Sequence, residues 1–255
     1  EFARLTNRAG FDASWEGKQT NITTGAERQD LFPFDEEFDF TRSVQYNIPF
    51  SIGYQFAKDK QAGVSASYSI RQFKDESKTG GQVFSQNDSQ RLSVQPFLSW
   101  EPTPRFSLDV GVGYTQQFVD DNGTNPNNKD EGTINTSVTI NHSPNKRYDH
   151  SLSFRRDLDR GLSTNNLVTN KIDYDFSWQF IRRTSLVGTL SYENGEESGP
   201  IGEDFDRYQA RLGLAYRLNN KTTFDVSYNF TKKNSNQSDR DFTRNLVQFG
   251  INYDF

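Results

Sequence analysis

Apolar and polar residues alternate along most of the chain, a pattern typical of β-strands with one apolar face. In the clearest segment, Val44 to Phe56, every second residue is aliphatic or aromatic, and the residues between are Ser, Asn, Gln, Gly or Pro. The same alternation predicts strands at 64–70, 92–100, 106–114, 134–140, 148–154, 172–180, 186–192, 208–216, 224–230 and 247–255, and weaker ones at 5–15 and 22–26. The pattern therefore predicts about 13 strands and no helix.

The predicted connections alternate between short and long. Tight turns are expected at 17–19, 58–60, 101–104, 143–146, 182–184 and 219–221, and polar loops at 29–38, 74–88, 119–131, 157–165, 194–205 and 232–241. Bacterial outer-membrane barrels have short periplasmic turns, long extracellular loops and an even number of strands. Counted back from the C-terminus, the first strand begins on the long-loop side. We therefore expect either that residues 1–255 form the C-terminal part of a larger barrel, or that residues 1–18 form no barrel strand.

The composition indicates which face of these strands meets lipid. The 255 residues include 22 Phe, 11 Tyr and 3 Trp, yet only 32% are hydrophobic and the mean hydropathy is -0.87. A barrel of 12–14 strands encloses a lumen too wide for Val and Phe to fill, so its apolar face must point outward. Residues 44–56, tilted by about 45°, rise roughly 30 Å, the thickness of one hydrocarbon core. We predict a single transmembrane, antiparallel, up-and-down β-barrel domain; a soluble β-sandwich or β-repeat protein is the alternative.

Other features narrow the classes of function. The chain has no Cys, which excludes disulfides and thiol chemistry. It also has no run of about 18 apolar residues, which argues against a membrane-spanning helix. The formal net charge of -5 argues against a nucleic-acid partner.

Charged and amide side chains at inward positions are candidates for lining the lumen. They are Arg91, Asp109, Arg155, Asp173, Asp175, Arg207, Gln209, Arg211, Asp225 and Arg244, with Arg217 and Asp254 in the same register. Asp173 and Asp175 form an acidic ladder two strands from the ladder of Arg207, Gln209 and Arg211. Two interpretations stay open: the charges pair across strands and brace the wall, or they create a transverse field that orients polar solutes.

Neither catalysis nor a metal site is strongly indicated. His142 and His150 flank one tight turn in the outward register, whereas Ser143 and Ser151 lie in the inward register, so a Ser/His arrangement is not assembled. We interpret both histidines as polar residues at the rim of the membrane and expect no enzyme activity and no cofactor. Asp120, Asp121, Asp130 and Glu131 are weak candidates for binding Ca²⁺ or Mg²⁺, but Pro126 interrupts the loop that carries them.

The last strand carries a resemblance. Gln248, Gly250, Tyr253 and Phe255 follow a polar–Gly–aromatic–aromatic spacing. This spacing resembles the C-terminal signal by which the insertion machinery recognises bacterial outer-membrane barrels. The resemblance implies that machinery as a partner, and outer-membrane lipid and lipopolysaccharide as surroundings.

A second resemblance extends from about residue 160 to the end. The segments 208–218, 222–230 and 241–245 are similar to the porin-like outer-membrane barrels encoded beside exosortase and exopolysaccharide-export systems of Gram-negative bacteria. This resemblance implies passage of a solute or polymer, with export-system components as partners. From the sequence we therefore expect an outer-membrane pore for polar solutes or for a polymer such as exopolysaccharide. A plugged structural or adhesion barrel whose loops bind a partner, and a barrel enzyme, are the alternatives.

Overall fold

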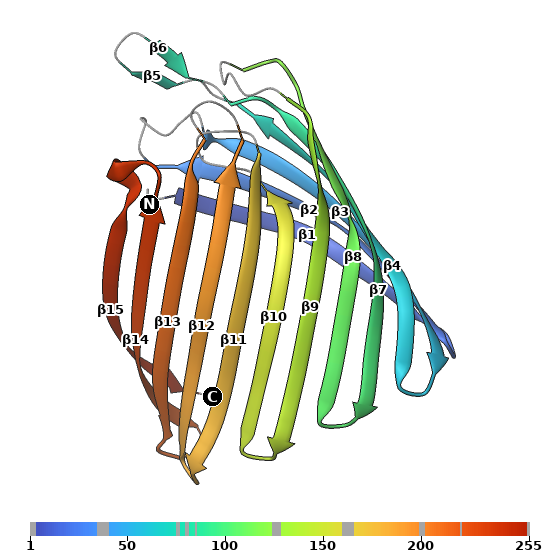
Figure 1. Ribbon diagram of the computed structural model, residues 1–255, viewed down its shortest axis with the longest axis vertical. Coiled ribbons are helices and arrows are strands. Elements are labelled where there is room, and N and C mark those ends of the chain that lie inside the picture. Colours follow the sequence, from blue (N-terminus) through green and yellow to red (C-terminus); the bar gives the residue numbers. More distant parts are fainter. Residues whose placement is uncertain are drawn as a thin grey trace.

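The computed structural model describes residues 4–34, 41–74, 77–79, 82–84, 86–123, 129–159, 166–198, 202–219 and 221–253. Thirteen strands form one curved antiparallel sheet in chain order (Figure 1). They are β1 (Arg4–Glu16), β2 (Thr20–Pro33), β3 (Ser43–Ala57), β4 (Lys60–Phe73), β7 (Ser89–Thr103), β8 (Phe106–Val119), β9 (Glu131–Asn145), β10 (Tyr148–Asp159), β11 (Leu167–Ile181), β12 (Thr184–Glu197), β13 (Asp204–Arg217), β14 (Thr222–Ser235) and β15 (Phe242–Tyr253). The predicted all-β, up-and-down architecture is confirmed.

The turns form at or close to the predicted positions, because the two-residue alternation and the turn chemistry are both local, although β7 and β9 run further than predicted, to Thr103 and Asn145. Gly17 donates its amide to the carbonyl of Thr20 at 2.7 Å and closes the β1–β2 turn. In the next hairpin, Ala57 pairs with Lys60 around Lys58 and Asp59. All short turns lie at one end of the sheet, which we call the turn end, and the longer connections lie at the other, the loop end.

At the loop end, the strands and loops have other boundaries than the sequence predicts. β2, β10, β12 and β14 run further into the expected loops, to Pro33, Asp159, Glu197 and Ser235. The expected loop 74–88 contains a separate hairpin of β5 (Ser77–Thr79) and β6 (Gln82–Phe84). The expected loop 232–241 contains one short 3-10 turn, Ser238–Arg240, and the described chain is otherwise built of strands, as predicted. Polar strand extensions lack the apolar alternation on which the prediction depended.

Residues 4–16 belong to the sheet, so the expectation that residues 1–18 might form no strand is overturned. Thirteen residue pairs join β1 to β2. The sheet is not closed: within the described residues, β1 is bonded to β2 alone and β15 to β14 alone. Both edge strands run from the loop end to the turn end and are therefore parallel to each other.

The apolar side chains do not form an interior core. Val44, Leu158 and Phe205 are the buried hydrophobic residues among those described, whereas Phe11 and Phe249 are 67% and 82% exposed. A soluble protein of this size would bury many more such residues. No helix in the described part of the chain is long and apolar enough to cross a membrane.

Candidate functional site

The concave face of the sheet is identified by contacts that skip strands. Arg91 on β7 donates from Nη2 to Oδ1 of Asp157 on β10 at 2.6 Å, although β8 and β9 lie between them. Neighbouring strands are about 4.8 Å apart, so side chains can meet across two strands only where the sheet curves toward them. The Arg91 register of each strand therefore faces the inside, and the apolar register lies on the convex face.

The inner face from β3 to β9 is mainly neutral and polar. Asn135 on β9 is 5% exposed, and its Nδ2 donates to the hydroxyls of Ser93 on β7 and Thr115 on β8 at 2.7 and 2.8 Å. The Thr115 hydroxyl also bonds to that of Ser93 at 3.0 Å. These uncharged side chains brace one another across three strands.

Small residues on this face make room for such contacts. Gln61 on β4 donates from Nε2 to Oδ1 of Asn21 on β2 at 2.7 Å, passing over Gly53 on β3. A Cβ at position 53 would overlap both of these side chains. A hollow of about 580 Å³ lies beside this region, with Ser14, Thr23, Ser51, Ser67 and Gln95 in its lining.

The inner face from β10 to β15 is charged. Arg207 pairs with Glu193 across β13 and β12 at 3.3 Å, whereas Lys171 pairs with Asp173 two residues along the same strand at 2.9 Å. Asp175 accepts a hydrogen bond from the Thr189 hydroxyl at 2.6 Å. Asp173, Asp175 and Arg207 of the predicted ladders thus have partners beside them, and the acidic and basic ladders do not pair with each other in these contacts.

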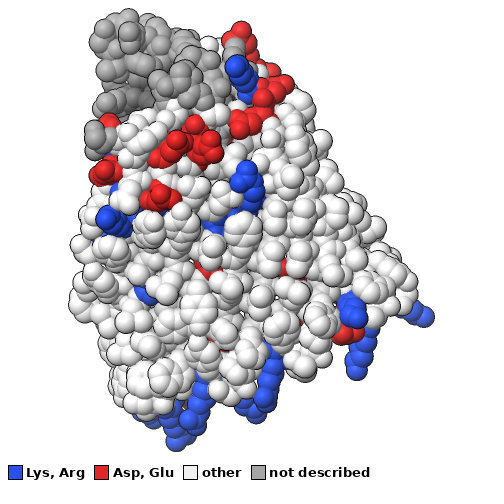
Figure 2. All heavy atoms as spheres, in the orientation of Figure 1, with Lys and Arg blue, Asp and Glu red and all other residues white. Residues whose placement is uncertain are grey.

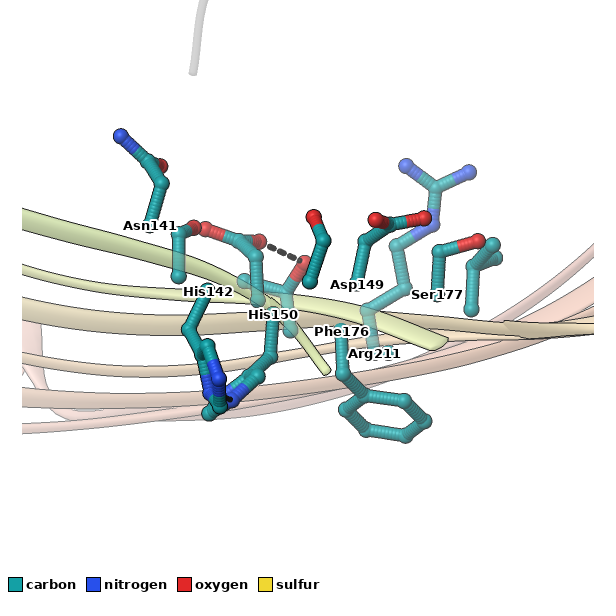
Figure 3. A pocket seen from close by; sticks show the side chains of 13 residues that line it. Asn141, His142, Asp149, His150, Phe176, Ser177 and Arg211 are labelled. Carbon is teal, nitrogen blue, oxygen red and sulfur yellow. Dashed lines mark hydrogen bonds between the residues drawn. The ribbon is translucent and has the colours of Figure 1, made fainter. Parts of the chain in front are cut away.

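A hollow of about 480 Å³ lies on the charged half (Figure 3). Asp149, Ser177 and Arg211 project to one side of the sheet there, and His142, His150 and Phe176 project to the other. Asp175 lies between Ser151 and Thr189 in neighbouring strands, and Thr189 lies opposite Arg211. The hollow therefore offers carboxylate, hydroxyl and guanidinium groups to a polar solute, but no nucleophile activated by a base.

The remaining predicted lining residues occupy the same inner register. Asp109 lies opposite Thr139, Arg155 opposite Lys171, Gln209 opposite Ser191 and Arg244 opposite Thr231. Asp225 accepts a hydrogen bond from Nδ2 of Asn252 at 3.1 Å. Arg217 pairs with Thr223 near the turn end, and Asp254 lies outside the described residues. Sequence reasoning did not single out Asp157, Lys171 or Glu193, because Asp157 lies in a predicted loop and the other two lie one residue outside the predicted strands.

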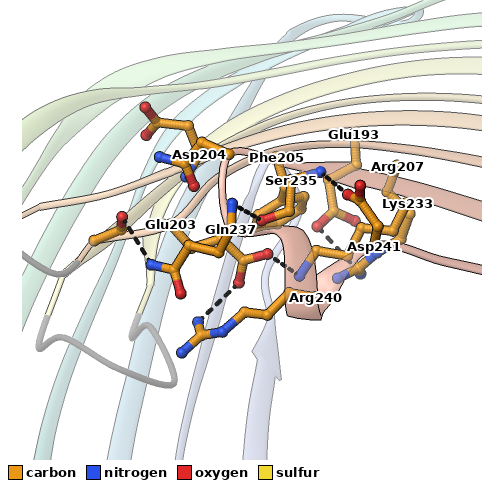
Figure 4. Close-up of polar contacts among 12 residues, drawn as sticks. Glu193, Glu203, Asp204, Phe205, Arg207, Lys233, Ser235, Gln237, Arg240 and Asp241 are labelled. Atoms are coloured by element: carbon orange, nitrogen blue, oxygen red, sulfur yellow. Dashed lines mark hydrogen bonds and ion pairs between the residues drawn. The ribbon is translucent and has the colours of Figure 1, made fainter.

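A buried cluster at the loop end was not predicted (Figure 4). Glu203 is 2% exposed; its carboxylate pairs with Lys233 on β14 and accepts a hydrogen bond from Nη1 of Arg240 at 3.0 Å. The Lys233 ammonium and the Arg207 guanidinium lie 4.5 and 5.0 Å from the centroid of the Phe205 ring. Glu203 and Arg240 lie in a predicted loop, where alternation gives no information.

The pKa of Glu203 reflects this setting. Burial by itself raises the pKa of the carboxyl, but hydrogen bonds from Lys233, Ser235 and Arg240 outweigh it and hold the pKa below its ordinary value. The carboxylate therefore stays ionised and fixes the 3-10 turn at Ser238–Arg240 to β13 and β14.

The two histidines pair on the convex face, as the interpretation of a polar rim requires. Nδ1 of His142 lies 3.0 Å from Nε2 of His150, and the hydroxyls of Tyr148 and Tyr174 are 2.9 Å apart beside them. Each pair satisfies polar atoms that would otherwise face lipid. Ser143 and Ser151 belong to the opposite register, so no catalytic arrangement forms between these residues.

The loop carboxylates do not converge on a cation site. Asp120 and Asp121 are exposed, and Asp130 accepts the Val119 amide at 2.9 Å. Glu131 begins β9 opposite Gln117. Among the described residues, no three His, Asp or Glu side chains are grouped to hold a metal ion.

The last strand continues the same two faces. Gln248 accepts a hydrogen bond from Asn229 at 3.0 Å, and a Cβ at Gly250 would lie 2.5 Å from Oδ1 of Asp225. Tyr253 pairs with Thr222 at the turn end. Phe255 lies outside the described residues. The role of these residues as an insertion signal stays a prediction.

Comparison with known proteins identifies a family and a fold. A family model described as "Putative beta-barrel porin 2" matches residues 99–255. A search of curated proteins found no match.

Among solved structures, the FrpB iron transporter from Neisseria meningitidis (F3-3 variant) aligns with a TM-score of 0.68 at 10% identity, covering 99% of this chain and 48% of that one. The ferric-catecholate import receptor Fiu from E. coli K12 gives 0.57 at 10% identity, with 92% and 48% covered. The ferric yersiniabactin uptake receptor FyuA from Yersinia pestis gives 0.55 at 10% identity, with 93% and 43% covered. The chain thus spans about half the length of these proteins, and the similarity shows the fold.

Proposed function

We propose that the chain, which belongs to the bacterial outer-membrane family "Putative beta-barrel porin 2", lines a water-filled passage for polar solutes with its concave face. The observation that carries this proposal is the separation of the two faces. Asn, Gln, Ser, Thr and charged residues occupy the inner register, and the aromatic and aliphatic residues of the outer register are largely exposed. Exposed apolar side chains are unfavourable in water but not in lipid, so the outer face fits a lipid environment. The polar inner face fits contact with water.

A passage requires a closed wall, and the two sheet edges support a specific form of closure. Unpaired N–H and C=O groups at a lipid-exposed edge are costly. Because β1 and β15 run in the same direction, an odd number of additional strands is needed to join them by antiparallel pairs alone. We infer that this sheet is one part of a larger barrel wall. A scan of cysteine pairs between β1 and β15 tests this, since efficient direct cross-linking in membranes would contradict it.

The neutral half of the inner face supports a polyhydroxylated solute. Side chains in the hollow, such as Ser67 and Gln95, offer hydrogen bonds without a net charge that would bind a solute tightly, so a sugar chain can exchange partners as it moves. The export of a polymer such as exopolysaccharide, with export-system components as partners, is the specific form of this proposal. It is supported by the hydroxyl and amide lining and by the resemblance of residues 208–245.

Conductance and solute flux test the proposal. Folded protein in planar bilayers should give stable conductance, and vesicles containing it should swell in neutral oligosaccharides up to a size limit. Folded protein that inserts but gives neither signal would instead support a plugged structural or adhesion barrel. Activity against phospholipid or peptide substrates would support the enzyme alternative.

A further inference from the structure

Exposed cations gather along the turn end of the molecule (Figure 2). The turns and the strand residues that flank them carry Lys18, Lys58, Lys60, Arg105, Lys146, Arg147, Arg182, Arg183 and Lys221, all of them exposed. We call this set the basic rim. Glu16, Asp59 and Glu101 are the acidic residues of the same segments, 16–20, 57–60, 101–105, 144–148, 181–184 and 217–222. The rim therefore has a marked excess of positive charge.

Backbone hydrogen bonds hold neighbouring turns in a continuous row. The carbonyl of Arg105 accepts the Ser143 amide at 2.8 Å, that of Arg147 accepts the Gln179 amide at 2.7 Å, and that of Arg183 accepts the Arg217 amide at 2.8 Å. Each turn is thereby fixed to the next hairpin. None of the described ion pairs includes a member of the basic rim. The positive charge is therefore ordered and available to a partner.

Aromatic side chains on the convex face set the depth of the rim in the membrane. The three tryptophans of the chain, Trp15, Trp100 and Trp178, all lie within a few residues of a tight turn and are exposed on that face. Trp100 donates from Nε1 to Asp59 at 3.0 Å. Tryptophan and tyrosine favour the boundary between hydrocarbon and headgroups, so cations just beyond them lie at the level of lipid phosphates.

We propose that the basic rim binds anionic phospholipid headgroups in the leaflet at the turn end. Guanidinium and ammonium groups donate to phosphate oxygens, and Arg does so with two parallel N–H bonds. The turns place these donors at the end of the wall, beside the surrounding lipid (Figure 2). The proposal rests on the outer-membrane placement of the chain and does not depend on solute passage.

Tryptophan quenching by brominated lipids tests the proposal. In a Trp15→Phe, Trp100→Phe double variant, Trp178 is the one remaining tryptophan. Because it lies four residues from Arg182, quenching of its fluorescence reports which lipids are bound beside the basic rim. Vesicles contain phosphatidylcholine and phosphatidylglycerol, with bromine on one lipid at a time. At low salt we expect phosphatidylglycerol to bind roughly two- to fivefold more strongly than phosphatidylcholine. The preference should approach one at high salt, because exposed charges are screened.

Two charge variants make the test specific. Lys146→Gln, Arg147→Gln and Arg182→Gln together should abolish the preference. The same number of exposed loop-end cations, changed in Lys74→Gln, Lys129→Gln and Lys232→Gln, should leave it intact. Equal quenching by both lipids at low salt, or equal loss in both variants, would overturn the proposal. The salt titration of the parent protein decides the matter if the rim variant does not fold, and absence of conductance would leave this result unaffected.

Discussion

Beyond β1 and β2, the concave face has two halves, β3 to β9 and β10 to β15, that share one strand pattern and differ in chemistry. Strands β3, β4, β7, β8 and β9 carry five charged residues in the inner register: Arg71, Arg91, Glu101, Asp109 and Glu131. Strands β10 to β15 carry eight acidic and seven basic ones, namely Asp149, Asp157, Asp159, Asp173, Asp175, Glu193, Glu197 and Asp225, and Arg155, Lys171, Arg207, Arg211, Arg217, Lys233 and Arg244. A solute between the halves meets hydroxyls and amides on one side and nearly balanced charges on the other.

The difference shows two ways in which the water-facing side chains of a barrel wall can be stabilised. In the neutral half, Asn135 connects three strands through hydroxyl groups. In the charged half, the ion pairs Lys171–Asp173 and Arg207–Glu193 join residues on one strand and on adjacent strands. Arg91 on β7 connects the two halves through Asp157 at 2.6 Å and Asp159 at 3.8 Å on β10. The neutral half therefore presents uncharged hydrogen-bonding groups to a solute. The charged half presents the electric field of charges that are held in place by their partners.

The largest expected effect concerns the strand that completes the charged half. Deleting residues 253–255 removes the end of β15 and the aromatic residues that resemble an insertion signal. Outer-membrane assembly in cells should fall sharply, and heat-modifiable mobility on gels would report it. Unchanged mobility after the deletion would contradict a signal at this end of the chain.

A substitution on the convex face tests whether both halves face water. Leu212→Arg should cost roughly 2–4 kcal/mol of unfolding free energy in a bilayer, because Leu212 faces lipid near the middle of β13. Gln209→Lys on the inner face of the same strand is the matched control and should be nearly silent. Denaturant titration from lipid vesicles measures both variants. If the effects were reversed, the apolar face would be the interior.

Two substitutions, one in each half, should lower the free energy of unfolding with different dependences on pH. Glu203→Gln leaves Lys233 and Arg240 without a carboxylate and should cost about 2 kcal/mol at neutral pH. The folded-state pKa of Glu203 lies below the ordinary value of 4.5, so its contribution is present above that value and is lost as pH falls through the folded pKa. Asn135→Ala in the neutral half should cost about 1 kcal/mol at every pH. Unfolding titrations at pH 7 and at acidic pH compare them, and a Glu203 effect independent of pH would contradict the assignment.

The smallest expected effect is ionic selectivity. Because the inner charges of β10 to β15 nearly balance, the acidic loop end, with residues such as Asp120, Asp121 and Asp130, should give a modest cation preference that weakens as salt rises. Reversal potentials in a salt gradient measure it. Bridging of these carboxylates to lipopolysaccharide phosphates by Ca²⁺ or Mg²⁺ would make the preference sensitive to chelators. Anion selectivity would show that the inner face dominates.

The sequence by itself determined the strands, the tight turns and the face on which each side chain lies, because a period of two and a Gly, Asn or Pro turn are properties of neighbouring residues. It therefore placed His142 and His150 outside and Asp175 and Arg211 inside. Only the tertiary structure decided which residues meet across the sheet. Arg91 reaches Asp157, and Glu203 reaches Lys233 and Arg240, because curvature and strand register bring distant segments together. Closure was also beyond the sequence pattern, since alternation is the same in an edge strand such as β1 as in a central one.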